Sequence, residues 1–144
     1  MSRSGYNDDG NVWGLICWRG AVASALRGRR GQAFLREMLA ALDALPEKKL
    51  IAHELEIGGA VCAIGAVGKA RGVDMSKFDP EDRDSVARAF GVAPALAAEI
   101  VFENDEALGW CSKEETPEAR FTRMRNWVAS QLIEWDNANS QRNS

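Results

Sequence analysis

The sequence predicts one mainly α-helical domain, a compact bundle of five to six helices with a small β-hairpin near residues 50–63. Two observations predict this fold. A chain of 144 residues with 46% hydrophobic and 27% charged content is typical of one globular domain with its own core. Apolar residues also recur at three- and four-residue steps, in segments separated by Gly and Pro. We expect the domain to span residues 11–136, between a flexible arm at 1–10 and a flexible tail at 137–144.

Two helices are expected in the first third of the chain. The first starts near Asn11 and closes at Gly28, where a left-handed residue would end it. The second runs from Gln32 to Leu45, and Pro46 ends it. Both have apolar positions at helical spacing: Leu15, Trp18, Val22 and Ala25 or Leu26 in the first, and Phe34, Met38, Ala41 and Leu45 in the second.

The turn between these two helices, RGRRG, is a candidate anion site. Arg27, Arg29 and Arg30 stand beside glycines just before a helix start, and Arg36 follows with no acidic residue between them. Free backbone N–H groups and the helix dipole favour an anion at such a place. The four arginines therefore predict a site for a phosphate-bearing ligand. A solvated basic turn is the alternative.

The central stretch, residues 50–72, is rich in Gly and Ala. Residues 49–57 partly alternate and fit a strand, with a turn at Gly58-Gly59 and a partner strand at 60–63, although LIAHEL fits a helix equally well. AIGAVGKARG predicts a short helix that closes at Gly72, and its glycines at 65 and 68 predict close approach of another segment.

Three helices are expected in the second half. Asp79-Pro80-Glu81-Asp82 provides an N-cap, a proline and acids at the start of a helix that stops at Gly91. The next runs from Pro94 to Glu103. The last opens at Thr116-Pro117 and continues to about Asp136, with its apolar stripe at Phe121, Met124, Val128, Leu132 and Trp135.

Charge is distributed unevenly between the two halves of the chain. Residues 1–72 carry ten Lys and Arg against seven Asp and Glu, whereas residues 73–144 carry eight against fourteen. Such asymmetry bears on partners. We expect an exposed acidic helical face that docks onto a basic surface of a partner, formed by Glu99, Glu103, Asp105 and Glu106. The spacing of these acids fits no calcium-loop pattern, so no metal site is expected.

The helices around Gly91 have the spacing of a helix-turn-helix, which would make the protein a transcriptional regulator. However, the second helix carries Glu99, Glu103 and Asp105 where DNA phosphates would need Lys or Arg. DNA binding is therefore not expected, and a helical corner that serves the core accounts better for the pattern.

Catalytic chemistry has one candidate constellation. Cys62 and His53 are close in sequence, and the turn between them would bring a thiol near a base, as in a small Cys-dependent enzyme. No residue is assignable as an oxyanion donor or an orienting group. The other cysteines, Cys17 and Cys111, are far apart and form no zinc pattern with the single histidine. We expect no enzymatic activity and no cofactor.

The order of several short motifs resembles small accessory proteins of tailed phages and prophages. Those proteins have a Trp-Ala-Leu helix followed by Gln, a central Cys segment, a late Asn-Asp pair and a terminal amphipathic helix. The matching positions span about residues 13–133: Trp18, Ala25, Leu26, Gln32, Val61, Cys62, Gly65, Phe90, Gly91, Asn104, Asp105, Phe121, Trp127 and Val128. One cysteine stands here where the related segments often have two. The resemblance implies an accessory protein without implying a particular activity.

Together these patterns predict a non-enzymatic binding protein that modulates a host process. Counter-defence is one such process, either as an anti-CRISPR protein or by sequestering a signalling nucleotide. Its partner would be a host protein or a phosphorylated small molecule. The sequence has neither a signal peptide nor an apolar run that would span a membrane, so a cytoplasmic location is expected. The tryptophans Trp110, Trp127 and Trp135 suggest a homodimer interface.

Overall fold

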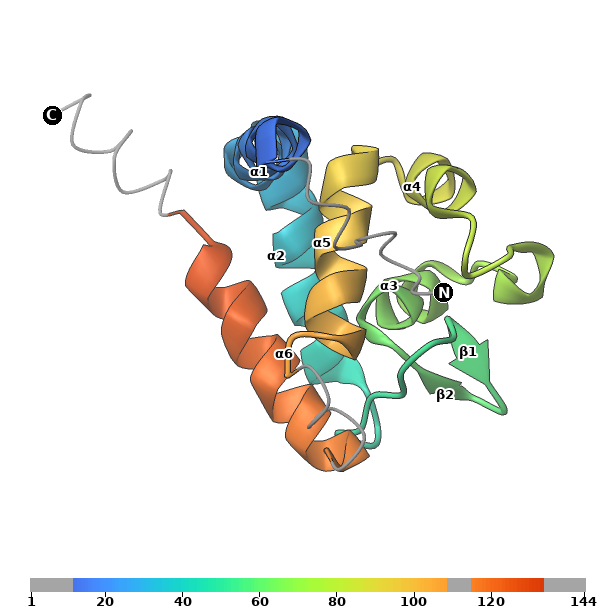
Figure 1. Cartoon of the computed structure of the whole chain (residues 1–144). Coiled ribbons are helices and arrows are strands. Elements are labelled where there is room, and N and C mark those ends of the chain that lie inside the picture. The colour runs from blue at the N-terminus through green and yellow to red at the C-terminus, as the bar shows by residue number, and fades with distance from the viewer. Residues whose placement is uncertain (1–11, 109–114, 134–144) are drawn as a thin grey trace, which may run out of the picture.

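The computed structural model describes residues 12–108 and 115–133, and side chains from residue 17 onward. The predicted arm at 1–10 and tail at 137–144 lie outside these ranges. The described chain forms six α-helices, one 3-10 turn and one small antiparallel sheet, which confirms a mainly α-helical fold with a hairpin (Figure 1). The elements are α1 Val12–Arg27, α2 Arg29–Ala44, β1 Glu56–Ile57, β2 Ala60–Val61, α3 Ala63–Arg71, η1 Met75–Lys77, α4 Arg83–Phe90, α5 Pro94–Asp105 and α6 Pro117–Gln131.

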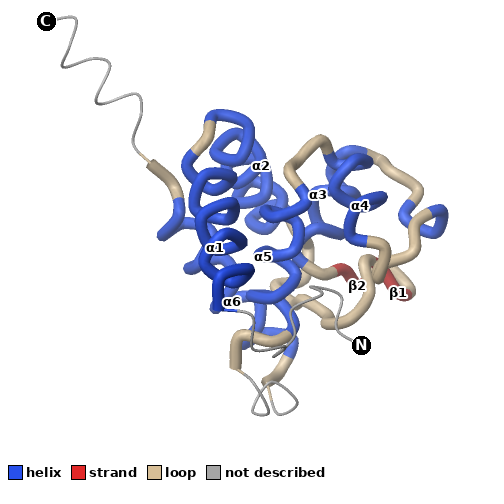
Figure 2. Tube along the Cα trace, turned by 45° about the horizontal axis from the view of Figure 1, so that its top comes forward, coloured by secondary structure: helices blue, strands red, loops and turns tan. Residues whose placement is uncertain are grey.

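Helix α5 is the centre of the molecule. It packs against α1, α3, α4 and α6, while α2 packs against α1, α3 and α6. The tube drawing shows α5 between the α1–α2 pair and the α3–α4 side of the molecule (Figure 2). Every residue from 95 to 101 is buried. A helix that is surrounded in this way buries all its faces, not one stripe.

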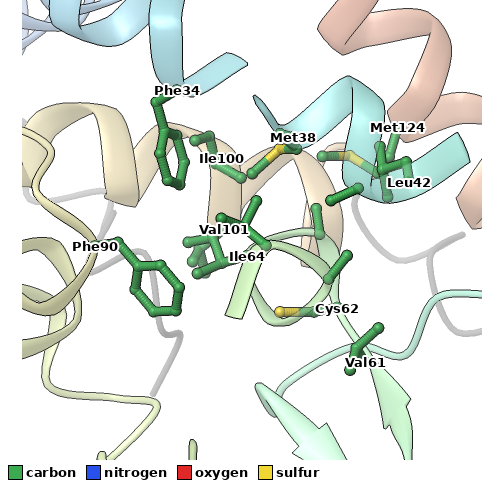
Figure 3. Close-up of a cluster of buried hydrophobic side chains, with 14 of the residues drawn as sticks. Phe34, Met38, Leu42, Val61, Cys62, Ile64, Phe90, Ile100, Val101 and Met124 are labelled. Atoms are coloured by element: carbon green, nitrogen blue, oxygen red, sulfur yellow. The ribbon is translucent and has the colours of Figure 1, made fainter. Parts of the chain in front are cut away.

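The core brings together side chains from five helices. Phe34 and Met38 of α2 meet Ile64 of α3, Ile100 of α5 and Met124 of α6, with Phe90 of α4 at one side (Figure 3). The predicted stripes of α2 and of the first part of α6 are therefore correct. Phe34, Met38, Ala41, Leu45, Phe121, Met124 and Val128 are all buried.

The hairpin is present but shorter than the alternation predicted. Gly58 and Gly59 form its turn, with φ of 56° and 90°, and Glu56 pairs with Val61. The strand does not reach back to residue 49, because the N–H groups of Leu50 and His53 bond to other segments, although the N–H of Ile51 still donates to the carbonyl of Val61 at 2.9 Å. The N–H of Leu50 donates to the carbonyl of Pro117 at 3.0 Å, for example.

Helix α3 forms as predicted, and its glycines have the expected packing role. It ends at Gly72, whose φ of 73° is left-handed. A Cβ on Gly65 would lie 2.0 Å from the carbonyl oxygen of Leu55, and one on Gly68 would lie 2.6 Å from the sulfur of Met75. Larger residues at either position would push these segments apart.

Several predicted helix ends shift in the structure. Gly28 has φ −67° and ψ 159°, not a left-handed conformation, because α2 begins at the next residue and Gly28 is its extended N-cap. Helix α4 begins at Arg83 with Asp82 as its cap, since Asp79 instead accepts a hydrogen bond from the N–H of Glu81 within the preceding turn. Helix α6 ends at Gln131, short of the predicted Asp136.

Within the described residues, no single helix is long and apolar enough to cross a membrane. Helices α4 and α5 would reach such a length only together, and they are bent by 108° where they meet.

Candidate functional site

The arginine corner, meaning Arg27, Arg29, Arg30 and Arg36, lies where α1 ends and α2 begins. Only Gly28 separates the two helices. Gly31 makes the sharp corner sterically feasible: a Cβ there would lie 1.8 Å from the carbonyl oxygen of Ala25. The corner therefore depends on a residue without a side chain in the first turn of α2.

A hollow of about 240 Å³ opens at this corner. Arg29 and Arg30 line it, together with small or apolar residues from α1 and from the start of α5. Arg27 and Arg36 lie outside its lining. The structure thus brings together two of the four predicted arginines, and it adds residues that sequence reasoning missed. These residues are uncharged, so the sequence gives no signal that they line a site: Ser24, Ala25, Gly28, Gly31, Ala93 and Leu96.

The arginines of the corner differ in their partners. All four are exposed. Arg36 donates a hydrogen bond from its guanidinium to the carbonyl of Ile133 at 2.9 Å. No hydrogen bond or ion pair joins the guanidinium of Arg27, Arg29 or Arg30 to another residue in the described ranges. Within those ranges, three guanidinium groups are therefore not engaged by the fold.

Two helix starts border the hollow. The N-caps of α2 and α5 are Gly28 and Ala93, and neither cap accepts a hydrogen bond with its side chain. Backbone N–H groups of a first turn, together with the helix dipole, attract an anion. The C-terminal end of α1 lies beside them with opposite polarity, but two of its carbonyls are engaged, at Ser24 by the N–H of Gly28 and at Leu26 by the amide of Gln32. Two arginine side chains and the first turns of two helices therefore offer donors around the hollow.

The predicted acidic face is wrong as an exposed surface. Glu99 and Asp105 are buried, with 4% and 2% of their surface exposed, and Glu103 and Glu106 are partly buried. The cause is the central position of α5, which packs against four other helices and buries every residue from 95 to 101. A partner-binding surface formed by Glu99, Glu103, Asp105 and Glu106 is therefore withdrawn.

These acids serve the interior instead. Arg19 of α1 forms an ion pair with Glu99 at 2.9 Å. Burial raises the pKa of Glu103, and repulsion by Glu99 one turn earlier adds to this, while Arg123 and Arg19 act in the opposite direction. Arg123 also donates to the carbonyls of Glu103 and Asn104 at the end of α5. The ion pair of Arg19 and the hydrogen bonds of Arg123 thus join α5 to α1 and α6.

The Asn104-Asp105 pair fixes the segment before the hairpin. The amide of Asn104 donates to the carbonyl of Ile51 at 2.9 Å and accepts from the N–H of Ala63 at 3.2 Å. A carboxylate oxygen of Asp105 accepts from the N–H of His53 at 3.2 Å, and the imidazole lies 3.8 Å from the other oxygen. His53 has φ of 72°, a conformation that non-glycine residues rarely adopt unless other contacts hold them.

The Cys62 and His53 constellation does not form a reactive pair in this geometry. Cys62 is 1% exposed and acts as the N-cap of α3, where its sulfur accepts from the N–H of Gly65 at 3.4 Å. The imidazole of His53 faces Asp105 and is largely exposed. A substrate would not reach the buried sulfur without opening the fold.

The helix-turn-helix alternative also conflicts with the structure. Its recognition helix would be α5, which would have to enter a DNA groove. All residues of α5 from Ala95 to Val101 are buried. Gly91 is exposed at the corner between α4 and α5, and both helices pack into the core, as the favoured interpretation of the sequence expected.

The remaining sequence predictions concern the tryptophans and a metal site. Trp127 is partly buried against the core, while Trp110 and Trp135 lie outside the described residues, so the homodimer interface stays a prediction. Within the described ranges, no three His, Cys, Asp or Glu side chains are grouped so as to hold a metal ion.

Comparison with known proteins adds no assignment to this geometry. No protein family, no curated protein and no solved structure matches the chain.

Proposed function

We propose that the protein is a non-enzymatic phage or prophage accessory protein that captures a phosphorylated small molecule at the arginine corner. One observation carries this proposal: Arg29 and Arg30, both without partners in the described ranges, line a hollow bordered by two helix starts that lack side-chain caps. Arginine and free backbone N–H groups are the donors that phosphate oxygens take. Capture of a signalling nucleotide in the host cytosol would modulate a host process, for instance a defence response.

The size of the hollow favours a phosphate group over a whole nucleotide. Pockets that enclose a drug-sized ligand measure roughly 300–1,000 Å³, and this one measures about 240 Å³. A phosphate or diphosphate would enter it, and the rest of the ligand would lie on the surface. Arg27, the last residue of α1, is exposed outside the lining and adds positive charge to the corner.

Isothermal titration calorimetry with pyrophosphate, and then with ATP, tests the proposal. In the Arg29→Ala, Arg30→Ala double variant we expect a loss of affinity of at least about tenfold, which corresponds to about 1.4 kcal/mol. Because both side chains are exposed and unpaired in the described ranges, the free energy of unfolding should change by less than about 0.5 kcal/mol. Binding should weaken as salt rises.

The matched control is Arg88→Ala, which removes an exposed arginine from α4. It should leave the affinity within about twofold of the parent. Equal affinities for the parent, the double variant and the control would mean that the corner is a solvated basic turn, and the proposed function would be abandoned.

A further inference from the structure

The hydrogen-bond donors around the hollow are concentrated in the first turn of α2. The backbone N–H groups of Arg29, Arg30 and Gly31 make no hydrogen bond with another described residue. The N–H of Gln32 is the first in this helix that is engaged, by the carbonyl of Gly28 at 2.9 Å. Three N–H groups and the two arginine side chains of the lining therefore face an anion from the same turn.

The α5 side of the hollow is poor in donors and apolar. Pro94 opens α5 and has no N–H, and the N–H of Leu96 donates to the carbonyl of Ala93 at 3.0 Å. Ala93 and Leu96 both line the hollow. Leu96 also lies close to the first turn of α2, since a Cβ on Gly31 would be 3.4 Å from a methyl carbon of Leu96. Anion donors and apolar surface thus adjoin each other in one hollow.

We propose that the ligand of the arginine corner is a phosphate monoester, whose phosphate binds the first turn of α2 and whose ester carbon group packs on Ala93 and Leu96. The assignment rests on the proposed function, because it names the chemical class of ligand for the same site. A second charged group on the α5 side would lose water and find few donors there. An apolar group on that side binds more tightly because it leaves water.

Two anions that differ by one apolar group test the assignment. Calorimetry compares phenyl phosphate with inorganic phosphate at about pH 8, where both are dianions. If the phenyl ring buries roughly 40 Å² of apolar surface, the parent protein should bind phenyl phosphate about fivefold more tightly than inorganic phosphate. The Arg29→Ala, Arg30→Ala variant should bind both anions weakly.

Ala93→Asn makes the α5 side polar without adding charge. Ala93 is the N-cap of α5, a position where Asn is favourable, so the variant should fold. It should bind both anions with affinities within about twofold of each other, because the ring loses its apolar contact. The matched control is Ala40→Asn, at an exposed position farther along α2, which should keep the fivefold preference.

Equal affinities of the parent for the two anions would overturn the assignment, and so would a preference that survives Ala93→Asn. Neither result touches the proposed function, because phosphate would still bind through the arginines. The proposed function fails if the Arg29→Ala, Arg30→Ala variant binds inorganic phosphate like the parent. A parent protein that binds neither anion would overturn both.

NMR spectra locate the two parts of the ligand separately. With phenyl phosphate, the backbone N–H resonances of Arg29, Arg30 and Gly31 should shift, and nuclear Overhauser effects should join the ring protons to the methyl groups of Ala93 and Leu96. Inorganic phosphate should shift the same N–H resonances. Ring contacts that exclude Ala93 and Leu96 would contradict the assignment even if phenyl phosphate bound more tightly.

Discussion

The arginine corner and the C-terminal end of α5 are the two charged clusters that the sequence displays most clearly, and the fold treats them in opposite ways. At the corner the charges are exposed, and Arg29 and Arg30 lack partners in the described ranges. At the end of α5, Glu99 and Asp105 are buried and paired. A cluster of charged residues in a sequence therefore indicates an exposed surface only where the helix that carries it has a side that no other element covers.

The difference follows from the positions of the helices. Arg29 and Arg30 in the first turn of α2 are exposed, whereas α5 packs against four other helices and buries every residue from 95 to 101. A buried charge or amide is strongly destabilising unless it finds a partner. Accordingly Asn104, Asp105 and Glu99 are held by hydrogen bonds or ion pairs from other segments.

The largest expected loss of stability is at the C-terminal end of α5. Asn104→Ala removes bonds to Ile51, Ala63 and Asp105 and leaves a buried N–H and a carbonyl without a partner. We expect the free energy of unfolding to fall by about 3 kcal/mol. Urea unfolding followed by circular dichroism measures it.

The control for this change is Asn126→Ala, which truncates an exposed Asn on α6. Its stability should stay within about 0.5 kcal/mol of the parent. If Asn104→Ala is as mild as Asn126→Ala, the end of α5 does not hold the segment before the hairpin.

The second largest loss of stability is expected at Gly31, in the arginine corner. Gly31→Ala places a methyl group 1.8 Å from the carbonyl oxygen of Ala25, so α1 and α2 must separate. We expect a loss of about 2 kcal/mol and a weaker pyrophosphate complex, because the hollow changes shape. Thermal unfolding and calorimetry measure the two consequences.

Gly20→Ala is the matched change in α1, where an added Cβ meets no atom within 4 Å. Here the better helix propensity of Ala should raise stability by about 0.5–1 kcal/mol. A gain at both glycines would show that α1 and α2 do not approach each other as closely as this geometry requires.

The smallest expected effect is the pH dependence of stability that Glu103 causes. Folding raises the pKa of Glu103, chiefly by burial, so its ionised form is less favourable in the folded than in the unfolded chain. Its charge therefore reduces stability at neutral pH, and the reduction disappears as pH falls through the raised value to the ordinary carboxyl range. Glu103→Gln should stabilise the protein by about 0.3 kcal/mol at pH 7 and not below pH 4.

Urea midpoints measured across this pH range follow the effect of Glu103. Glu56→Gln, at an exposed position in β1, serves as the control and should change the urea midpoint equally little at pH 7 and below pH 4. A Glu103→Gln variant that is less stable than the parent at pH 7 would mean that its pairing with Arg123 and Arg19 outweighs burial.

Much of the fold could be predicted because its signals are local. The apolar stripe of α2, the Gly58-Gly59 turn and the left-handed ends at Gly72 and Gly91 depend on residues within a few positions of one another. Gly28 shows the limit of such signals. A glycine after a helix is compatible with two conformations, and the immediate start of α2 selects the extended one.

The candidate site could be predicted only in part. Arg29 and Arg30 were visible as charges beside a helix start. Ala93 and Leu96 were not, because they come from a helix more than sixty positions away in the chain and carry no charge.

The motif residues behind the phage resemblance have structural roles here. Gln32 joins the ends of α1 and α6, Cys62 caps α3, and the Asn104-Asp105 pair holds residues 51–53. The order of these motifs along the chain therefore reflects contacts that stabilise the fold. Arg29 and Arg30 of the arginine corner take no part in those contacts.

By itself, the sequence determined the helical fold class, the hairpin turn and the accumulation of arginine between the first two helices, since periodicity, glycine conformation and local charge are properties of neighbouring residues. Only the tertiary structure decided which charged segment faces solvent. That depends on which helix the others surround. The six apolar residues between positions 95 and 101 place α5 in the middle, and its acids Glu99 and Asp105 are buried with it.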